Sequence, residues 1–414
     1  MHNSFIHQPS TRREFMKTGA KGIGLIAFSQ FAPAFLTRSV AAELPSAEKD
    51  RSILVMIQLA GGNDGLNTLI PYTDDNYFRL RPNLALQAED RIAISDSLAL
   101  HKGCSPMAQM FKEGKLGIVQ NVGYPNPNRS HFRSSEIWET ASSSDETLYT
   151  GWVGRYLDNS CSGSPVDDCP QAVHFTNEIP QSFHADHPLN IFGTGATGSA
   201  SGAKSNRDLL GELSGMGNSE HSNASYLQHT LMDALVTEER VDQIFKQYKT
   251  SVKYPNTKLA QSLKRIAAMI AAGMDTRVYF ASLGGFDTHV NQLTSHGRLM
   301  IELAEAMQSF QLDLESKGLQ DQVLTMTFSE FGRRASENGS KGTDHGTAAP
   351  LFVMGSNVKS NLIGTAPSLD IGENKDISYS TDFRQVYATV LEKWLDCKQS
   401  ETVLGAKFDS LAFL

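Results

Sequence analysis

The sequence predicts an α/β protein, a three-layer sandwich in which a mostly parallel sheet is covered by helices on both faces. Short apolar runs of β-forming residues alternate with longer stretches in which apolar residues recur at helical spacing. The short runs are mostly apolar on both alternating faces, as expected for strands buried on both faces of a parallel sheet. Several of them end in loops rich in Gly, Asp and Asn, which are residue types that stop a strand.

The first predicted strand, Ile53 to Leu59, ends at the loop Gly-Gly-Asn-Asp-Gly of residues 61–65. The second, Leu116 to Val122, is followed by a loop and then by a helix from Ser130 to Thr140. Residues 192–225 are rich in Gly, Ser, Ala and Asn. We therefore expect a flexible insert on the surface there.

The second half of the chain continues the alternation of strands and helices. Its predicted elements are, in order, helices over 225–248 and 259–272, a strand over 277–283, a helix over 296–317, strands over 322–328 and 349–355, and a helix over 381–395. Gly318 is expected to end the helix that precedes it.

The composition is that of a soluble globular protein, with 414 residues, 40% hydrophobic residues and 20% charged residues. It excludes a disordered chain, a collagen-like fibre and a small cysteine-rich scaffold. The net charge of −8 comes without any basic stripe, which argues against a nucleic-acid partner. The length allows two or three domains of about 150 residues, or one large α/β domain with an insert, which we expect over residues 43–414.

The first 42 residues are predicted to be an export signal. Arg12 and Arg13 are followed by an apolar stretch over 19–36 and then by the small residues Val40-Ala41-Ala42, which suit a signal peptidase. Paired arginines are typical of the twin-arginine translocation (Tat) route, so the mature protein is expected in the periplasm or outside the cell. The alternative is a basic first helix of the mature fold. No later segment has the ~18 apolar residues that a membrane span requires.

The chain has four cysteines and no Cys-x-x-Cys pair, which makes a thiolate zinc site unfavourable. Cys161 and Cys169 lie eight residues apart in a Ser/Pro/Asp-rich loop. In an oxidising compartment these two could form a disulfide.

Residue types that bind metals or act as nucleophiles follow four predicted strands. Because the loops after parallel strands meet at one edge of a sheet, we expect these side chains to gather there. The candidates, strand by strand, are Asn63 and Asp64; Arg129, Ser130 and His131; Asp287, His289 and, further along, His296; and Glu330, Arg333, Asp344 and His345.

Carboxylates combined with imidazoles suit Zn²⁺ or Mn²⁺, and a site dominated by carboxylates would accept Ca²⁺ or Mg²⁺. The sequence therefore predicts one or two divalent metal ions. Ser130 begins a helix, where free N–H groups and the helix dipole stabilise negative charge. Beside a cation, its hydroxyl could ionise and attack a phosphorus or sulfur ester, while Arg129 could hold an oxyanion.

Each candidate also has a purely structural interpretation. Asp64 lies in a sequence that favours a turn, and Ser130 could simply cap a helix. Glu330 could pair with Arg333 or its neighbour, and His345 could be satisfied within its loop. The occurrence of all of them at successive strand ends favours a functional site.

Six segments resemble an exported bacterial family, the domain of unknown function 1501 family, whose members carry Tat signals. They are Ile57 to Asn67, Arg129 to Phe132, Gly151 to Leu157, Gly285 to His289, Ser329 to Arg333 and Thr343 to Gly346. The resemblance extends from about Ile53 to Leu395. That family is in turn similar, more distantly, to the alkaline phosphatase and sulfatase superfamily.

This more distant resemblance implies an alkaline-phosphatase-like fold and specific roles for several residues. It implies that Asp64 binds the metal nearer the nucleophile, that Ser130 is the nucleophile, and that Asp287, His289 and His345 bind the other metal. The superfamily places its aspartate and histidine four residues apart, whereas Asp287 and His289 are two residues apart. His296 could take the place of the superfamily's histidine. The superfamily also has Asp-His where this chain has Glu330-Phe331, and the change to Phe331 removes one imidazole ligand. A single metal ion is therefore as well supported as two. The Cys-x-Pro-x-Arg segment of sulfatases is absent.

Two functions are consistent with these observations. The first is an exported metal-dependent hydrolase of phosphate or sulfate esters, on small molecules or polymers, in which Ser130 attacks with help from Arg129 and His131. Asp64, Asp287, His289, Glu330 and His345 would bind the metal, and Asn63, Asp344, His296 and Arg333 would contact the substrate or support the ligands. The alternative is a metal-containing binding or assembly protein of the cell envelope, without catalysis.

Overall fold

The computed structural model describes residues 51–159, 169–194, 237–359, 361–372 and 375–414. The predicted export signal, Cys161 and residues 195–225 of the predicted insert lie outside the described residues. Of the predicted helix over 225–248, the described part is helical over 237–247.

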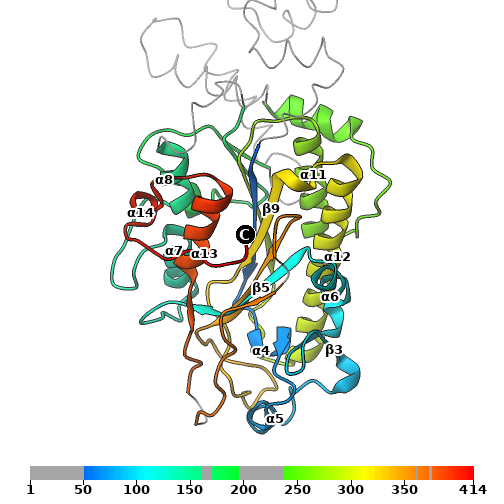
Figure 1. Cartoon of the computed structure of the whole chain (residues 1–414), viewed down its shortest axis with the longest axis vertical. Coiled ribbons are helices and arrows are strands. Elements are labelled where there is room, and N and C mark those ends of the chain that lie inside the picture. The colour runs from blue at the N-terminus through cyan, green and yellow to red at the C-terminus, as the bar shows by residue number, and fades with distance from the viewer. Residues whose placement is uncertain (1–50, 160–168, 195–236, 360, 373–374) are drawn as a thin grey trace, which may run out of the picture.

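A nine-stranded sheet forms the middle of the molecule (Figure 1), in the order β11-β5-β10-β9-β1-β8-β6-β7, with β12 paired to β5. All its pairs are parallel except those that β10 makes with β5 and β9. The predicted mostly parallel sheet is therefore confirmed. The strands are β1 (Ile53–Ala60), β5 (Leu116–Gly123), β6 (Ala172–His174), β7 (Ile191–Gly193), β8 (Val278–Gly284), β9 (Val323–Phe328), β10 (Ala349–Met354), β11 (Leu362–Ile363) and β12 (Thr381–Asp382).

Helices cover both faces of this sheet, which confirms the three-layer arrangement (Figure 1). Alternate residues of β1 show why: Val55 and Ile57 face one apolar core, whereas Leu54 and Met56 face the other. The helices of the first layer are α6 (Ser105–Lys112), α11 (Lys258–Ala271) and α12 (Gln292–Lys317), and those of the second are α7 (His131–Thr140), α8 (Trp152–Asp158), α13 (Phe383–Thr389) and α14 (Ser400–Leu404).

Observed and predicted elements agree closely where the apolar runs are long. The five predicted strands begin and end within one residue of β1, β5, β8, β9 and β10. The helix α12 ends at Gly318, whose φ of 67° is readily adopted by glycine. The predicted last helix is α13 followed by a π-helical turn over Val390–Trp394.

Several short elements were not predicted. A small antiparallel sheet joins β2 (Leu69–Ile70), β4 (Ala99–His101) and β3 (Arg91–Ala93), next to the short helices α4 (Gly65–Thr68) and α5 (Asp75–Leu80). Strands of two or three residues are too short to give a periodic pattern. The strand β7 also occupies the start of the predicted insert.

Cys169 is a buried free thiol whose Sγ accepts a hydrogen bond from the Asp275 backbone N–H at 3.1 Å. The disulfide considered for Cys161 and Cys169 is therefore absent, and Cys397 is disulfide-bonded instead. Within the described ranges, no helix is both long and apolar enough to cross a membrane.

The direction of β10 brings one more loop to the predicted site. Because β10 is antiparallel to β9 and β5, its first residue lies at the edge where its neighbours end. The loop that precedes β10, which contains Asp344 and His345, therefore meets the loops that follow β1, β5, β8 and β9.

Candidate metal centre

Glycines let the loops after β1 and β8 pack against each other. Gly61 has a φ of 118°, and a Cβ there would lie 2.4 Å from the backbone N of Asp287. Only a residue without a side chain fits such an approach. The Phe286 N–H also donates to the Ala60 carbonyl at 3.1 Å, so the two strand ends are fixed together.

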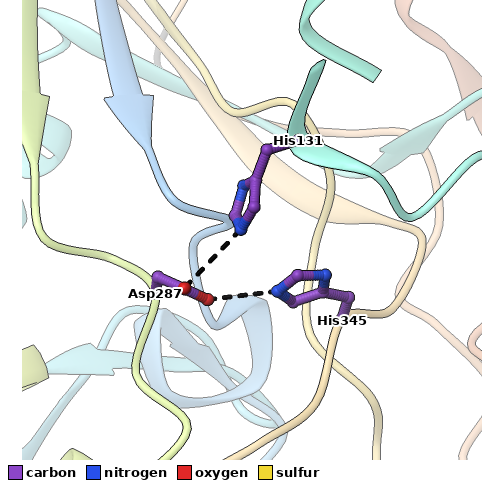
Figure 2. A group of neighbouring side chains, drawn as sticks. All are labelled: His131, Asp287 and His345. Carbon is purple, nitrogen blue, oxygen red and sulfur yellow. Dashed lines mark hydrogen bonds and ion pairs between the residues drawn. The ribbon is translucent and has the colours of Figure 1, made fainter. Parts of the chain in front are cut away.

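Asp287 lies at the centre of a histidine cluster (Figure 2). Its Oδ1 is 3.1 Å from His345 Nε2, and its Oδ2 is 3.6 Å from His131 Nε2. The same Oδ1 is 3.0 Å from Nε2 of His289, which Figure 2 does not draw. Potential ligand atoms of His131, Asp287 and His345 all lie within 4.8 Å of one another. The Asp287 side chain is 47% exposed, so a substrate can reach the cluster.

The far nitrogen of each ring faces an oxygen acceptor. His131 Nδ1 is 2.9 Å from Glu330 Oε1, His345 Nδ1 is 2.8 Å from the Arg129 carbonyl, and His289 Nδ1 is 3.3 Å from Asp344 Oδ1. We assign the protons to the three Nδ1 atoms because a carbonyl or carboxylate can only accept. In the neutral rings, the Nε2 lone pairs then point at a carboxylate. Such an arrangement is repulsive unless a cation or an added proton lies between the groups. Metal-bound histidines usually donate their other ring N–H to an oxygen in this way.

Arg333 keeps Asp287 ionised and ties three loops together. Partial burial alone would raise the pKa of Asp287, but the hydrogen bond and the charge of Arg333 lower it to about 2. The buried guanidinium donates to Asp287 Oδ1 at 2.7 Å and to the carbonyls of Gly62 and Thr343 at 2.8 Å each. Its donors are used within the protein, so Arg333 positions Asp287.

Glu330 is hydrogen-bonded to His131 and lies outside the group formed by His131, Asp287 and His345. Its buried Oε1 accepts from the Gly61 N–H at 2.8 Å as well as from His131. The neighbouring Phe331 ring packs against His131 and His345, with centroids 4.9 and 4.6 Å away. A hydrogen-bonded carboxylate behind an imidazole makes the ring a stronger ligand.

Asp64 lies in the interior with a different partner. Its fully buried carboxylate is bound by Arg81, with Nη1 to Oδ2 at 2.6 Å and Nη2 to Oδ1 at 2.9 Å, and Gln292 donates to the same group. Burial alone would raise the pKa of Asp64, but Arg81 lowers it below its usual value. A guanidinium thus neutralises the carboxylate for which the sequence predicts a metal ion.

Replacing Arg81 by methionine is expected to lower the free energy of unfolding by about 3–5 kcal/mol, because the Asp64 carboxylate would remain buried without its cation. The matched control is Arg79→Met in the same segment, whose exposed guanidinium should change stability by less than about 0.5 kcal/mol. Urea unfolding measures both. A small loss that added metal fully restores would show instead that Asp64 is free to bind metal.

Asn63 and His296 extend this interior network. His296 Nε2 is 3.1 Å from Asn63 Oδ1, which also accepts from Thr68 Oγ1 at 3.0 Å. Both Asn63 and His296 are buried. They contact neither Asp287 nor the three clustered histidines through any hydrogen bond of the described chain. His296 therefore lies apart from the clustered histidines.

The pH dependence of stability is expected to reflect His296. Burial lowers the pKa of His296 from 6.5 to about 4. Between these values the unfolded chain binds a proton that the folded chain does not. The contribution of His296 to the free energy of unfolding is therefore complete above pH 6.5 and is lost as the pH falls toward 4. At pH 5 the loss is about 2 kcal/mol. Urea unfolding at pH 7.5 and pH 5 measures the fall in the free energy of unfolding between these two values. In His296→Gln this fall should be smaller by the contribution of His296. His187→Gln, at an exposed site, should retain it, and equal losses in both variants would contradict the assignment.

Ser130 stands between two residues that contact the cluster. It is the N-cap residue of α7, it is exposed, and its side chain makes no capping hydrogen bond. The preceding Arg129 carbonyl faces His345, and the following His131 faces Asp287. The guanidinium of Arg129 is turned to Asp376. The hydroxyl of Ser130 is thus exposed and does not cap its helix.

The structure brings together His131, Asp287, His289 and His345, with Ser130 and Arg129 beside them and with Glu330, Arg333 and Asp344 behind them. It does not bring Asp64, Asn63 or His296 to Asp287. Arg81 and Gln292 were missed, because nothing in the sequence marks a guanidinium or an amide as the partner of one particular carboxylate.

Residues 51–402, which contain the whole cluster, match the family described as protein of unknown function DUF1501. No curated protein matches the chain.

Solved structures of low similarity include a protein in the alkaline phosphatase superfamily from Vibrio parahaemolyticus, at 8% identity and a TM-score of 0.32 over 75% of this chain and 62% of that one. The chain therefore spans less than two thirds of that protein. The C-terminal periplasmic domain of EcEptC from Escherichia coli, in complex with Zn, matches at 7% identity and a TM-score of 0.35 over 75% of each chain. Alkaline phosphatase from the Antarctic bacterium TAB5 matches at 10% identity and a TM-score of 0.29, over 74% of this chain and 90% of that one. With similarity this distant, the site rests on its own geometry.

Proposed function

We propose a function for this chain, which belongs to the DUF1501 family of proteins of unknown function: it is an exported, metal-dependent hydrolase of phosphate or sulfate esters. The observation that carries the proposal is the convergence of three Nε2 atoms on the Asp287 carboxylate, with each Nδ1 held by an oxygen acceptor. Residues 1–42 would be a cleaved Tat signal, and residues 43–414 a single domain.

His131, His289, His345 and Asp287 would hold the cation. Three imidazole nitrogens and one carboxylate suit Zn²⁺ or Mn²⁺, whereas Ca²⁺ and Mg²⁺ prefer oxygen ligands. The ion pair between Asp64 and Arg81 supports a single cation, because the charge of this carboxylate is already neutralised. When bound, a divalent cation stabilises an alkoxide and the charge on a non-bridging oxygen of the ester.

Ser130 is the proposed nucleophile. Its Oγ would form a bond to phosphorus or sulfur while the bond to the alcohol oxygen breaks, and the alcohol would leave with the proton that the hydroxyl gives up. Water would then attack the seryl ester, release the inorganic anion and restore Ser130. The N–H groups in the first turn of α7 favour negative charge at this position. Glu330 and Arg333 would keep His131 and Asp287 in place.

The proposal is tested by metal analysis and an ester panel on the same preparation. We expect about one Zn²⁺ or Mn²⁺ per chain, turnover of 4-nitrophenyl phosphate or 4-nitrophenyl sulfate, loss of turnover after chelation and recovery on adding the metal. A bound metal without turnover on phosphate or sulfate mono- and diesters would favour a binding or assembly protein. Absence of metal under all loading conditions would contradict both functions.

A further inference from the structure

Two arginines share one carboxylate next to the histidine cluster. The Arg129 guanidinium pairs with Asp376 Oδ2, and Arg334 Nε lies 3.9 Å from Asp376 Oδ1. Both arginines are attached to the site through their backbones. The Arg129 carbonyl faces His345 Nδ1 at 2.8 Å, and the Arg334 N–H donates to the Asp344 carbonyl at 3.0 Å.

The polar groups of this trio are not all satisfied. Arg334 Nε and Asp376 Oδ1 are both buried, and neither has a hydrogen-bond partner within the described part of the chain. At 3.9 Å they are too far apart to bond to each other. Leaving buried polar atoms unpaired is unfavourable, so the position lacks a group that satisfies them. Two guanidinium groups face this one carboxylate.

The backbone that follows Asp376 is held by contacts that do not involve the arginines. Thr347 Oγ1 donates to the Ile377 carbonyl, and the side-chain amide of Asn121 donates to the Ser378 carbonyl at 2.8 Å. The Ser380 N–H donates to the Asn121 carbonyl at 3.0 Å. The backbone that carries Asp376 is therefore attached to β5 by contacts that do not involve its side chain. The carboxylate can turn away while the segment stays bound.

We propose that Arg129 and Arg334 bind a second anionic group on the substrate, whose place the Asp376 carboxylate takes in the free protein. The inference rests on the proposed function, since the first anionic group is the ester that meets the metal centre. The substrates are then esters that carry another carboxylate, phosphate or sulfate. Guanidinium groups carry the opposite charge, and their planar fork of N–H donors can bind two oxygens of such an anion at once. Esters with one anionic group would bind only at the metal centre.

The test is equilibrium binding of two non-hydrolysable anions to the Zn²⁺-loaded protein, by calorimetry. Methylphosphonate carries one anionic group, and phosphonoacetate carries a carboxylate in addition. We expect phosphonoacetate to bind at least about tenfold more tightly, because one more charge-assisted contact is made. In Arg334→Gln the ratio of the affinity for phosphonoacetate to the affinity for methylphosphonate should fall to about 1–2. In Asp376→Asn it should rise several-fold, since the competing carboxylate is gone.

The outcomes separate this inference from the proposed function. Failure of methylphosphonate to bind would contradict the metal centre that the proposed function requires. Equal affinities for the two phosphonates, or a ratio that neither variant changes, would overturn the second-anion site alone. Arg79→Gln, an exposed arginine elsewhere on the chain, is the matched control and should leave the ratio unchanged. The contacts of residues 377–380 predict that Asp376→Asn keeps its thermal stability, and Arg334→Lys, which keeps the charge, should retain part of the ratio.

Discussion

Replacing Ser130 by alanine is expected to reduce kcat for ester hydrolysis by at least about 1000-fold, because no other group supplies the attacking oxygen. The metal content should not change. The contacts on either side of Ser130 come from the Arg129 carbonyl and the His131 ring, and neither depends on the hydroxyl. The helix should also persist, since the hydroxyl makes no capping bond.

The matched control is Ser135→Ala, which lies on the same helix α7 and should retain the parent rate. Steady-state kinetics and elemental analysis on the same samples separate loss of the nucleophile from loss of the metal. Full activity in Ser130→Ala would remove this residue from the mechanism. Loss of both activity and metal would mean that Ser130 supports the cation.

Replacing Asp287 by asparagine is expected to weaken metal binding by at least about 100-fold. Asp287 is the carboxylate on which the three rings converge, and its amide would carry no charge. The guanidinium of Arg333, 2.7 Å from Oδ1, would then repel a cation without compensation. Competition with a chromogenic chelator measures the change in Kd.

Two further variants make this a graded test. Glu330→Gln keeps an acceptor for the Gly61 N–H but loses the charge behind His131, so we expect about a tenfold loss of affinity. Asp75→Asn, in the first turn of α5, should have no effect. An Asp287→Asn variant that binds metal as tightly as the parent would refute the ligand set.

The long elements of the fold could be predicted because burial on both faces leaves a readable pattern. The strands β1, β5, β8 and β9 are mostly apolar runs of six to eight residues, and their ends place Ser130, Asp287 and Glu330 near one edge. The three-residue strands β6 and β7 carry no such pattern. The antiparallel direction of β10 was also hidden, since a buried strand has the same composition in either direction.

The site could be predicted as a group of residues but not as a set of roles. Asp64 and Asp287 both follow a strand in a glycine-rich loop, yet one faces the buried Arg81 and the other faces three imidazoles. Whether a carboxylate meets a guanidinium or a metal depends on which distant segment packs against it. For the same reason the sequence could not show that Glu330, predicted as a ligand, is hydrogen-bonded to His131.

The central claim is that one cation is bound by His131, His289, His345 and Asp287. Anomalous X-ray diffraction from crystals grown with Zn²⁺, recorded on both sides of the zinc absorption edge, tests it most directly. We predict one peak within about 2.0–2.2 Å of the three Nε2 atoms and an Asp287 oxygen. A peak beside Asp64 with Arg81 displaced, or no peak among the histidines at full zinc occupancy elsewhere, would contradict the claim.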